Sequence, residues 1–244
     1  MNKNNYLIIQ PTEMKAKIIP FILFCAMRLY STEYWYSTYS KKAHKKNREI
    51  PFDGSDYLIG NNEFTDSDFT LNKTKKFIKK YFQFNIWTDE EIEIIYTAAK
   101  LRKISIILFL TKIECESGLL SNYRRLKKDN KRYQQLMRWI LGYGMYTSVR
   151  LKDGSVWKPN GGFKKQIYGG ARCLRYWFDV YRTGMYNSVN LGERKIYSKN
   201  AATFSLYKYT PFWGKFSENG TKCAGNEKTK QIFYYYKSLW KCLK

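Results

Sequence analysis

The feature that most constrains the fold is an apolar segment near the middle of the chain, "SIILFLTKIECESG", which runs from Ser105 to Gly118. Residues 106–110 are apolar on every side of a helix, and a helix without a polar face has to be buried on all sides. Ser105 is a suitable N-cap, and Gly118 is of the residue type that most often ends helices. The sequence therefore predicts a helix over 106–117 at the centre of the core.

Other segments carry helical signals of their own. Thr88 in "TDEEIEIIYTAAKL" can cap a helix and Glu91 completes a capping box, while the acids of the first turn suit the helix dipole. The apolar residues of "LNKTKKFIKKYFQF" are spaced for a basic amphipathic helix over 71–82. Further helical stretches are expected at 133–141, 163–181 and 230–241.

Short strands fit only two stretches of the chain, 142–162 and 184–197, which are rich in Gly and turn-forming residues. With 244 residues and 44% hydrophobic content, the chain can bury a sizeable core. We therefore expect a mainly α fold with a central buried helix and at most a small β-hairpin region.

The first 55 residues differ from the rest. The apolar run from Ile18 to Met27 follows two lysines and resembles a short secretory signal if translation starts at Met14, although it is too short to span a bilayer. A buried N-terminal helix is the alternative. Residues 30–55 mix aromatics with basic residues, as a linker would. We expect 1–55 to be a signal-like segment and linker, 56–244 to be the folded domain, and the protein to be exported to the cell envelope or periplasm or associated with a membrane.

Composition limits the chemistry. The 44 Lys and Arg residues outnumber the 20 acids, and the net charge of +24 suggests a polyanionic partner such as nucleic acid, acidic lipid or a cell-wall polymer. The single histidine and five cysteines without a CxxC pair leave no parts for a zinc site or a histidine-based triad. No metal, nucleotide or flavin cofactor is expected, so acid and base catalysis would fall to carboxylates or tyrosines.

Two glutamates stand at the end of the predicted central helix. Glu114 and Glu116 are two positions apart, roughly 200° around a helix axis, so they cannot face the same way. One could point into a cleft, where an apolar setting helps a carboxylic acid to keep the proton that it donates to a leaving oxygen. The alternative is an ordinary acid at a helix end, paired with Lys112 or Arg124.

The "ESG" that follows an apolar helix resembles the catalytic signature of the lysozyme-like superfamily, especially lytic transglycosylases and related N-acetylglucosaminidases that cleave peptidoglycan. Further blocks resemble a bacterial branch of these proteins in the same order, from Tyr57 to Trp240. They are "YLIGNNEFTDSDF", "IIYTAAKLRKISIILFLTKIECESGLL", "RWILGYG", "GGFKKQIYGGARCLRYWF", "NAATFSLYKYTPFWG" and "FYYYKSLW". The resemblance implies a lysozyme-like catalytic domain over 56–244.

The resemblance also implies roles for single residues. It puts the catalytic glutamate at Glu116 and leaves Glu114 as a solvent-side or salt-bridging residue. Tyr209, or else Tyr207, would hydrogen-bond the catalytic carboxyl. Gln166 would bind a sugar acetamido group or hold the glutamate, or else act as a buried structural amide. The remaining substrate-binding residues would be Tyr143, Gly144 and Tyr168.

The chain departs from the family pattern after "GYG", where "MYTS" lacks the family's acid, and Met145 stands where the usual disulfide partner of Cys223 would be. The expected activity is therefore that of a lytic transglycosylase, which needs one glutamic acid to cleave the MurNAc–GlcNAc bond. An N-acetylglucosaminidase or muramidase is the alternative, with Asp153, Asp179 or Glu193 as the second acid.

The expected partners are peptidoglycan glycan strands and anionic wall polymers. Two alternatives of another class remain. One is an inert wall-binding protein. The other is a basic nucleic-acid-binding module that uses residues 41–48 and 123–133, although no known nucleic-acid-binding motif is present and no specific nucleic acid is expected.

Overall fold

The computed structural model describes residues 56–66, 68–82, 86–144, 149–150, 156–157, 160–191, 195–211 and 225–243. The expectations for residues 1–55, and for Asp153, Glu193 and Cys223, lie outside these residues.

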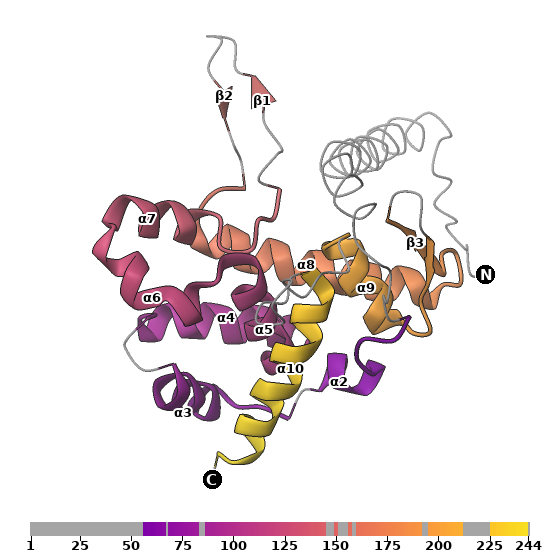
Figure 1. The fold of residues 1–244 in the computed structure, drawn as a ribbon, viewed down its shortest axis with the longest axis horizontal. Coiled ribbons are helices and arrows are strands. Elements are labelled where there is room, and N and C mark those ends of the chain that lie inside the picture. Colours follow the sequence, from indigo (N-terminus) through magenta and orange to yellow (C-terminus); the bar gives the residue numbers. More distant parts are fainter. Residues whose placement is uncertain are drawn as a thin grey trace, which may run out of the picture.

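Helices dominate the described chain, of which 69% is helical, so the predicted mainly α fold class is confirmed. The helices are α2 (Asn61–Thr65), α3 (Leu71–Tyr81), α4 (Asp89–Leu101), α5 (Ile106–Ser117), α6 (Leu119–Lys128), α7 (Asn130–Arg138), α8 (Phe163–Arg182), α9 (Ala201–Tyr209) and α10 (Gly225–Lys241). Figure 1 shows them gathered into one body, with α10 crossing in front of α5.

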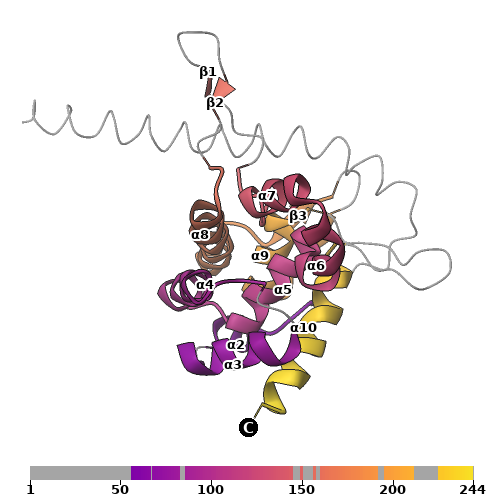
Figure 2. The same cartoon turned by 90° about the vertical axis from the view of Figure 1, so that its left-hand side faces the viewer.

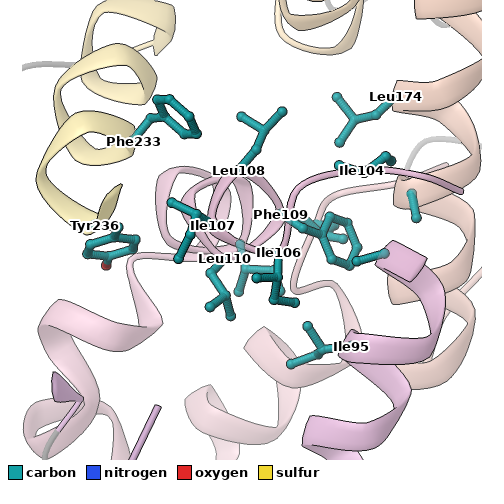
Figure 3. Close-up of a cluster of buried hydrophobic side chains, with 14 of the residues drawn as sticks. Ile95, Ile104, Ile106, Ile107, Leu108, Phe109, Leu110, Leu174, Phe233 and Tyr236 are labelled. Atoms are coloured by element: carbon teal, nitrogen blue, oxygen red, sulfur yellow. The ribbon is translucent and has the colours of Figure 1, made fainter. Parts of the chain in front are cut away.

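Helix α5 is the central helix that the apolar segment predicts. Its residues from Ile106 to Glu114 are all buried, and it packs against α4, α6 and α10. Figure 3 shows its side chains meeting Ile95 of α4, Leu174 of α8, and Phe233 and Tyr236 of α10. A helix that is apolar on every side is thus covered on every side.

The ends of α5 are fixed in different ways. Ser105 occupies the N-cap position, but its side chain makes no cap hydrogen bond, and its backbone N–H instead donates to the Phe64 carbonyl at 2.7 Å. At the other end, Gly118 adopts the left-handed conformation with φ of 61° and donates its N–H to the Glu114 carbonyl. Gly118 is also the N-cap of α6, so the chain starts a second helix at once.

Other helix boundaries agree with the expectations or differ by a few residues. The capping box of Thr88 and Glu91 begins α4 as predicted. Helix α7 begins at Asn130, earlier than expected, because the Asp129 side chain accepts a hydrogen bond from the Arg132 N–H and caps this helix. Helices α2, α6 and α9 were not among the expected helices.

Two small antiparallel sheets lie within the two segments where strands were expected. Strands β1 (Val149–Arg150) and β2 (Val156–Trp157) form a hairpin that stands away from the helices in both views (Figures 1 and 2). Strands β3 (Ser188–Asn190) and β4 (Lys195–Tyr197) pair with Val189 opposite Ile196, and β3 packs beside α9. Among the described helices, none combines the length and apolar character needed to cross a membrane.

Candidate active site around Glu116

Glu116 lies in the last turn of α5, and its side chain is 23% exposed. Its Oε1 atom accepts two hydrogen bonds, from Thr210 Oγ1 at 2.6 Å and from Lys112 Nζ at 2.7 Å. Within the described residues, nothing donates a hydrogen bond to the second oxygen, Oε2. One oxygen is therefore held in place, while the other has no donor in this part of the chain.

Lys112 lies one helical turn before Glu116, and its side chain is fully buried. A buried ammonium is stable only where its N–H groups have partners. Lys112 Nζ donates to Glu116 Oε1 and, at 2.8 Å, to Thr210 Oγ1, and it lies 4.9 Å from the centre of the Tyr209 ring. Two acceptors and an aromatic face together offset the cost of burying this charge.

Thr210 connects α5 to the end of α9. Its hydroxyl accepts from Lys112 and donates to Glu116, which closes a three-membered set of hydrogen bonds between segments 94 residues apart. Its backbone is anchored as well, because its N–H donates to the Leu206 carbonyl and its carbonyl accepts from Asn226 Nδ2 of α10. Hydrogen bonds to α9 and α10 therefore fix the backbone of Thr210, and its hydroxyl binds Glu116.

The tyrosine expected to hydrogen-bond the catalytic carboxyl does not do so. Tyr209 lies beside the site, but its hydroxyl donates to the Leu141 carbonyl at 2.9 Å, and its neighbour Thr210 makes the bond to Glu116. Burial, with the Glu116 carboxylate as a further cause, holds the pKa of Tyr209 well above its ordinary value of 10.0. Tyr207 is 1% exposed and belongs to the hydrophobic core.

Gln166 acts as a structural amide, which was one of the roles expected for it. It is fully buried in the first turns of α8. Its Oε1 accepts from the Tyr143 N–H at 3.0 Å, and its Nε2 donates to the carbonyls of Tyr143 and Asn160. Both ends of the amide are thus used to hold the turn that carries Tyr143.

Tyr143 and Gly144 form that turn, and Gly144 adopts a left-handed conformation with φ of 58°. The Tyr143 ring lies directly against Gly169, where a Cβ atom would come within 2.2 Å of the ring. Gly169 is therefore needed for the ring to lie on α8 at this height. Tyr168, the other expected substrate contact, is half-buried against the core.

The expected solvent-side position of Glu114 is wrong. Glu114 is 3% exposed, and its Oε2 accepts from the Leu120 N–H at 2.8 Å in the first turn of α6. The physical reason is the left-handed Gly118, because it starts α6 next to the end of α5 and leaves the first N–H groups of α6 in need of an acceptor. Glu114 thus stabilises the turn between α5 and α6, and Glu116 is the more exposed of the two glutamates.

Comparisons with protein-family models, curated proteins and solved structures found no match.

Neither Asp179 nor the described thiols hydrogen-bond to Glu116, Lys112 or Thr210. Asp179, one of the three expected second acids, is exposed and pairs with Arg175 on α8 at 2.8 Å. Cys115, Cys173 and Cys242 are free thiols, and desolvation raises the pKa of Cys173 to about 12. Within the described residues, no three His, Cys, Asp or Glu side chains converge on a point where they could ligate a metal ion.

The two partners of Glu116 differ in how well the sequence indicates them. Lys112 is four positions before Glu116, which is the spacing that pairs opposite charges on a helix. The sequence therefore indicates this pairing, as the ordinary alternative to a catalytic role. Thr210 is the residue that sequence reasoning missed. Its only signal is its position between Tyr209 and Pro211, in a block that resembles the family's tyrosine-bearing segment.

Proposed function

We propose that this protein cleaves the glycan strands of peptidoglycan as a lytic transglycosylase, with Glu116 as its single general acid and base. The observation that carries the proposal is a chain of hydrogen bonds between segments that each resemble a family block. Thr210 donates to Glu116, its neighbour Tyr209 donates to Leu141, and Gln166 holds Tyr143. The first of these bonds reaches the carboxyl itself, and the other two connect the neighbouring blocks to one another.

The reacting form of Glu116 carries a proton on Oε2, and in the first step it gives this proton to the oxygen that leaves C1 of the MurNAc residue. The bond between C1 and this oxygen breaks, and the carboxyl becomes a carboxylate. Lys112 and Thr210 already donate to Oε1, so they stabilise the negative charge that develops there. The ammonium is fully buried, where such an interaction is stronger than in water.

In the second step, the carboxylate takes the proton of the MurNAc 6-hydroxyl as its oxygen bonds to C1. The products are a 1,6-anhydro ring and a free GlcNAc hydroxyl, and Glu116 regains the proton it lost. No water and no second carboxylate take part. A hydrolase would need a second acid at about 5 to 10 Å, and Asp179 is already paired with Arg175.

The test is mass spectrometry of the soluble products that the full chain releases from purified peptidoglycan. The wild-type protein should release anhydromuropeptides, and Glu116→Gln should lower the rate by about 100-fold or more. Glu93→Gln, at an exposed position of α4, is the matched control and should remain active. Products with reducing ends would mean a hydrolase, and no release by a folded wild-type protein would contradict the proposal.

A second candidate is sequence-independent binding of a polyanion, and the α6 and α7 helices favour it. Lys128, Lys131 and Arg132 are exposed there, and none of them pairs with a described acid. Such binding would weaken steeply with salt and would persist in Glu116→Gln. Retention of the wild-type protein on an anionic polymer without any product would support this function over the enzyme.

A further inference from the structure

Arg172 on α8 is an exposed arginine beside one of the expected substrate residues. Its Nη2 donates to the Tyr143 hydroxyl at 2.7 Å, and its Cζ lies 6.0 Å from the centre of that ring. The guanidinium has five N–H donors, and one hydrogen bond to a phenol uses only one of them.

The charge of Arg172 is not neutralised by any acid in the described part of the chain. Arg175, one turn further along the same helix, shows the contrast. It donates from Nε and Nη2 to both oxygens of Asp179, so its guanidinium is already paired with a carboxylate. Arg172 therefore presents to solvent the kind of donor group that Arg175 uses to bind a carboxylate.

Tyr143, the hydrogen-bond partner of Arg172, is itself held in place. The Gln166 amide holds the backbone of Tyr143 on both sides, and Gly169 holds its ring against α8. Tyr143 is half-buried, so part of the residue remains accessible. A subsite built in this way has little conformational entropy left to lose on binding.

The pair is also connected to Glu116 through the hydrogen bonds of neighbouring residues. Tyr209 donates to Leu141, two residues before Tyr143, and the residue after Tyr209 holds Glu116. The charge of Arg172 and that of Lys112 both favour the thiolate of Cys173, although desolvation outweighs them and raises the pKa of this thiol. Cys173 is thus within electrostatic reach of both cations.

We propose that Tyr143 and Arg172 form a subsite for a sugar that carries a carboxylate. The sugar ring packs against the accessible part of Tyr143, and the carboxylate accepts hydrogen bonds from Arg172. This inference rests on the proposed function and adds to it a preference for acidic sugars over neutral ones. In peptidoglycan the carboxylate can come from the lactyl group of MurNAc or from the stem peptide.

The test is calorimetric binding to the full-length Glu116→Gln protein, which leaves the ligand intact. Three tetrasaccharides of alternating GlcNAc and MurNAc serve as probes. They carry free lactyl carboxylates, lactyl methylamides, or a dipeptide with a terminal carboxylate. We expect an acidic probe to bind about tenfold more tightly than the methylamide. Whichever acidic probe shows this preference identifies the source of the carboxylate.

Arg172→Gln, added to the Glu116→Gln protein, should remove this preference, so that the acidic probe and the methylamide bind with equal affinity. Lys164→Gln removes the same charge from another exposed position of α8 and should keep the preference. Equal affinity for all three probes, or an equal loss in both variants, would overturn the subsite while product release from peptidoglycan still supported the enzyme. No binding of any probe, together with no product release by the wild-type protein, would overturn both proposals.

Discussion

Lys112 Nζ lies 2.7 Å from Glu116 Oε1, one turn away on the same helix, and the lysine side chain is wholly buried while the glutamate side chain is 23% exposed. The lysine of this pair is therefore shielded from solvent, whereas the glutamate is partly accessible to it. The ammonium depends on Glu116 and Thr210 for its acceptors. Both hydrogen bonds of the carboxyl go to Oε1, and within the described residues Oε2 accepts none.

The first prediction concerns the stability of this pair. Glu116→Ala leaves a buried ammonium without its carboxylate and should cost about 2 to 3 kcal/mol of unfolding free energy, somewhat less than a fully buried pair. Glu116→Gln keeps a carbonyl acceptor and should cost less. Adding Lys112→Met to Glu116→Ala should recover part of the loss, because the unpaired charge is gone. Urea denaturation of these four proteins and of Lys112→Met alone measures this, and strictly additive effects of Glu116→Ala and Lys112→Met would contradict the coupling.

The second prediction concerns Thr210. Thr210→Val keeps the shape of the side chain but removes the hydroxyl that joins Lys112 to Glu116, so kcat for release of soluble products should fall about 10- to 100-fold. Thr210→Ser restores the hydroxyl and should remain within about threefold of the wild-type kcat. Similar losses in both variants would show that the methyl group, and not the hydrogen bond, matters.

The third prediction concerns the contact between α8 and the Tyr143 turn. Gly169→Ala places a Cβ atom 2.2 Å from the Tyr143 ring, so the ring has to move and the protein should lose about 2 kcal/mol of stability. In a Tyr143→Ala background the ring is gone, and the same substitution should be nearly neutral or slightly stabilising, since Ala is the better helix former. Thermal denaturation of the single and double variants provides the measurement. An equal cost in both backgrounds would contradict the clash.

The fourth prediction is a pH dependence at the contact between α2 and α10. Burial disfavours the charged form of Glu63, but hydrogen bonds from Lys237 and the Gly60 N–H outweigh it and lower the pKa of Glu63 below its ordinary value of 4.5. Since the folded state holds the proton less tightly than the unfolded state, Glu63 stabilises the fold above pH 4.5 and loses this effect as the pH falls through its lowered pKa.

The measurement for Glu63 is the difference in unfolding free energy between the wild type and Glu63→Gln. This difference should be largest near neutral pH and should shrink in acid. Glu93→Gln, at an exposed position of α4, should show no such trend. A difference that stays constant from neutral pH to pH 3 would contradict the role of the ionised carboxylate.

Local signals predicted much of the fold. The apolar run of α5, the Thr88 capping box and the turn at Gly118 each act within a few residues, and each lies where the sequence indicates. The start of α6 was missed because the sequence does not show that one glycine ends one helix and begins the next. This same corner buries Glu114, whose exposure was predicted wrongly.

The candidate site was less predictable because its bonds join distant segments. The family resemblance implied that Tyr209, or else Tyr207, bonds to Glu116, but the direction in which the end of α9 faces gives this bond to Thr210. Likewise, the sequence does not show that the oxygen and the nitrogen of the Gln166 amide both hydrogen-bond to the backbone of Tyr143.

The position of Thr210 also bears on when the site is completed during synthesis. Its hydroxyl serves α5, while its carbonyl is held by Asn226 at the start of α10. On the ribosome, Glu116 emerges long before either residue, and a nascent chain that has folded only through α8 still lacks the hydroxyl that joins Lys112 to the acid. The acid therefore gains its full set of hydrogen bonds only after the chain has been made through the start of α10, so the site is assembled after the other described helices have been synthesised.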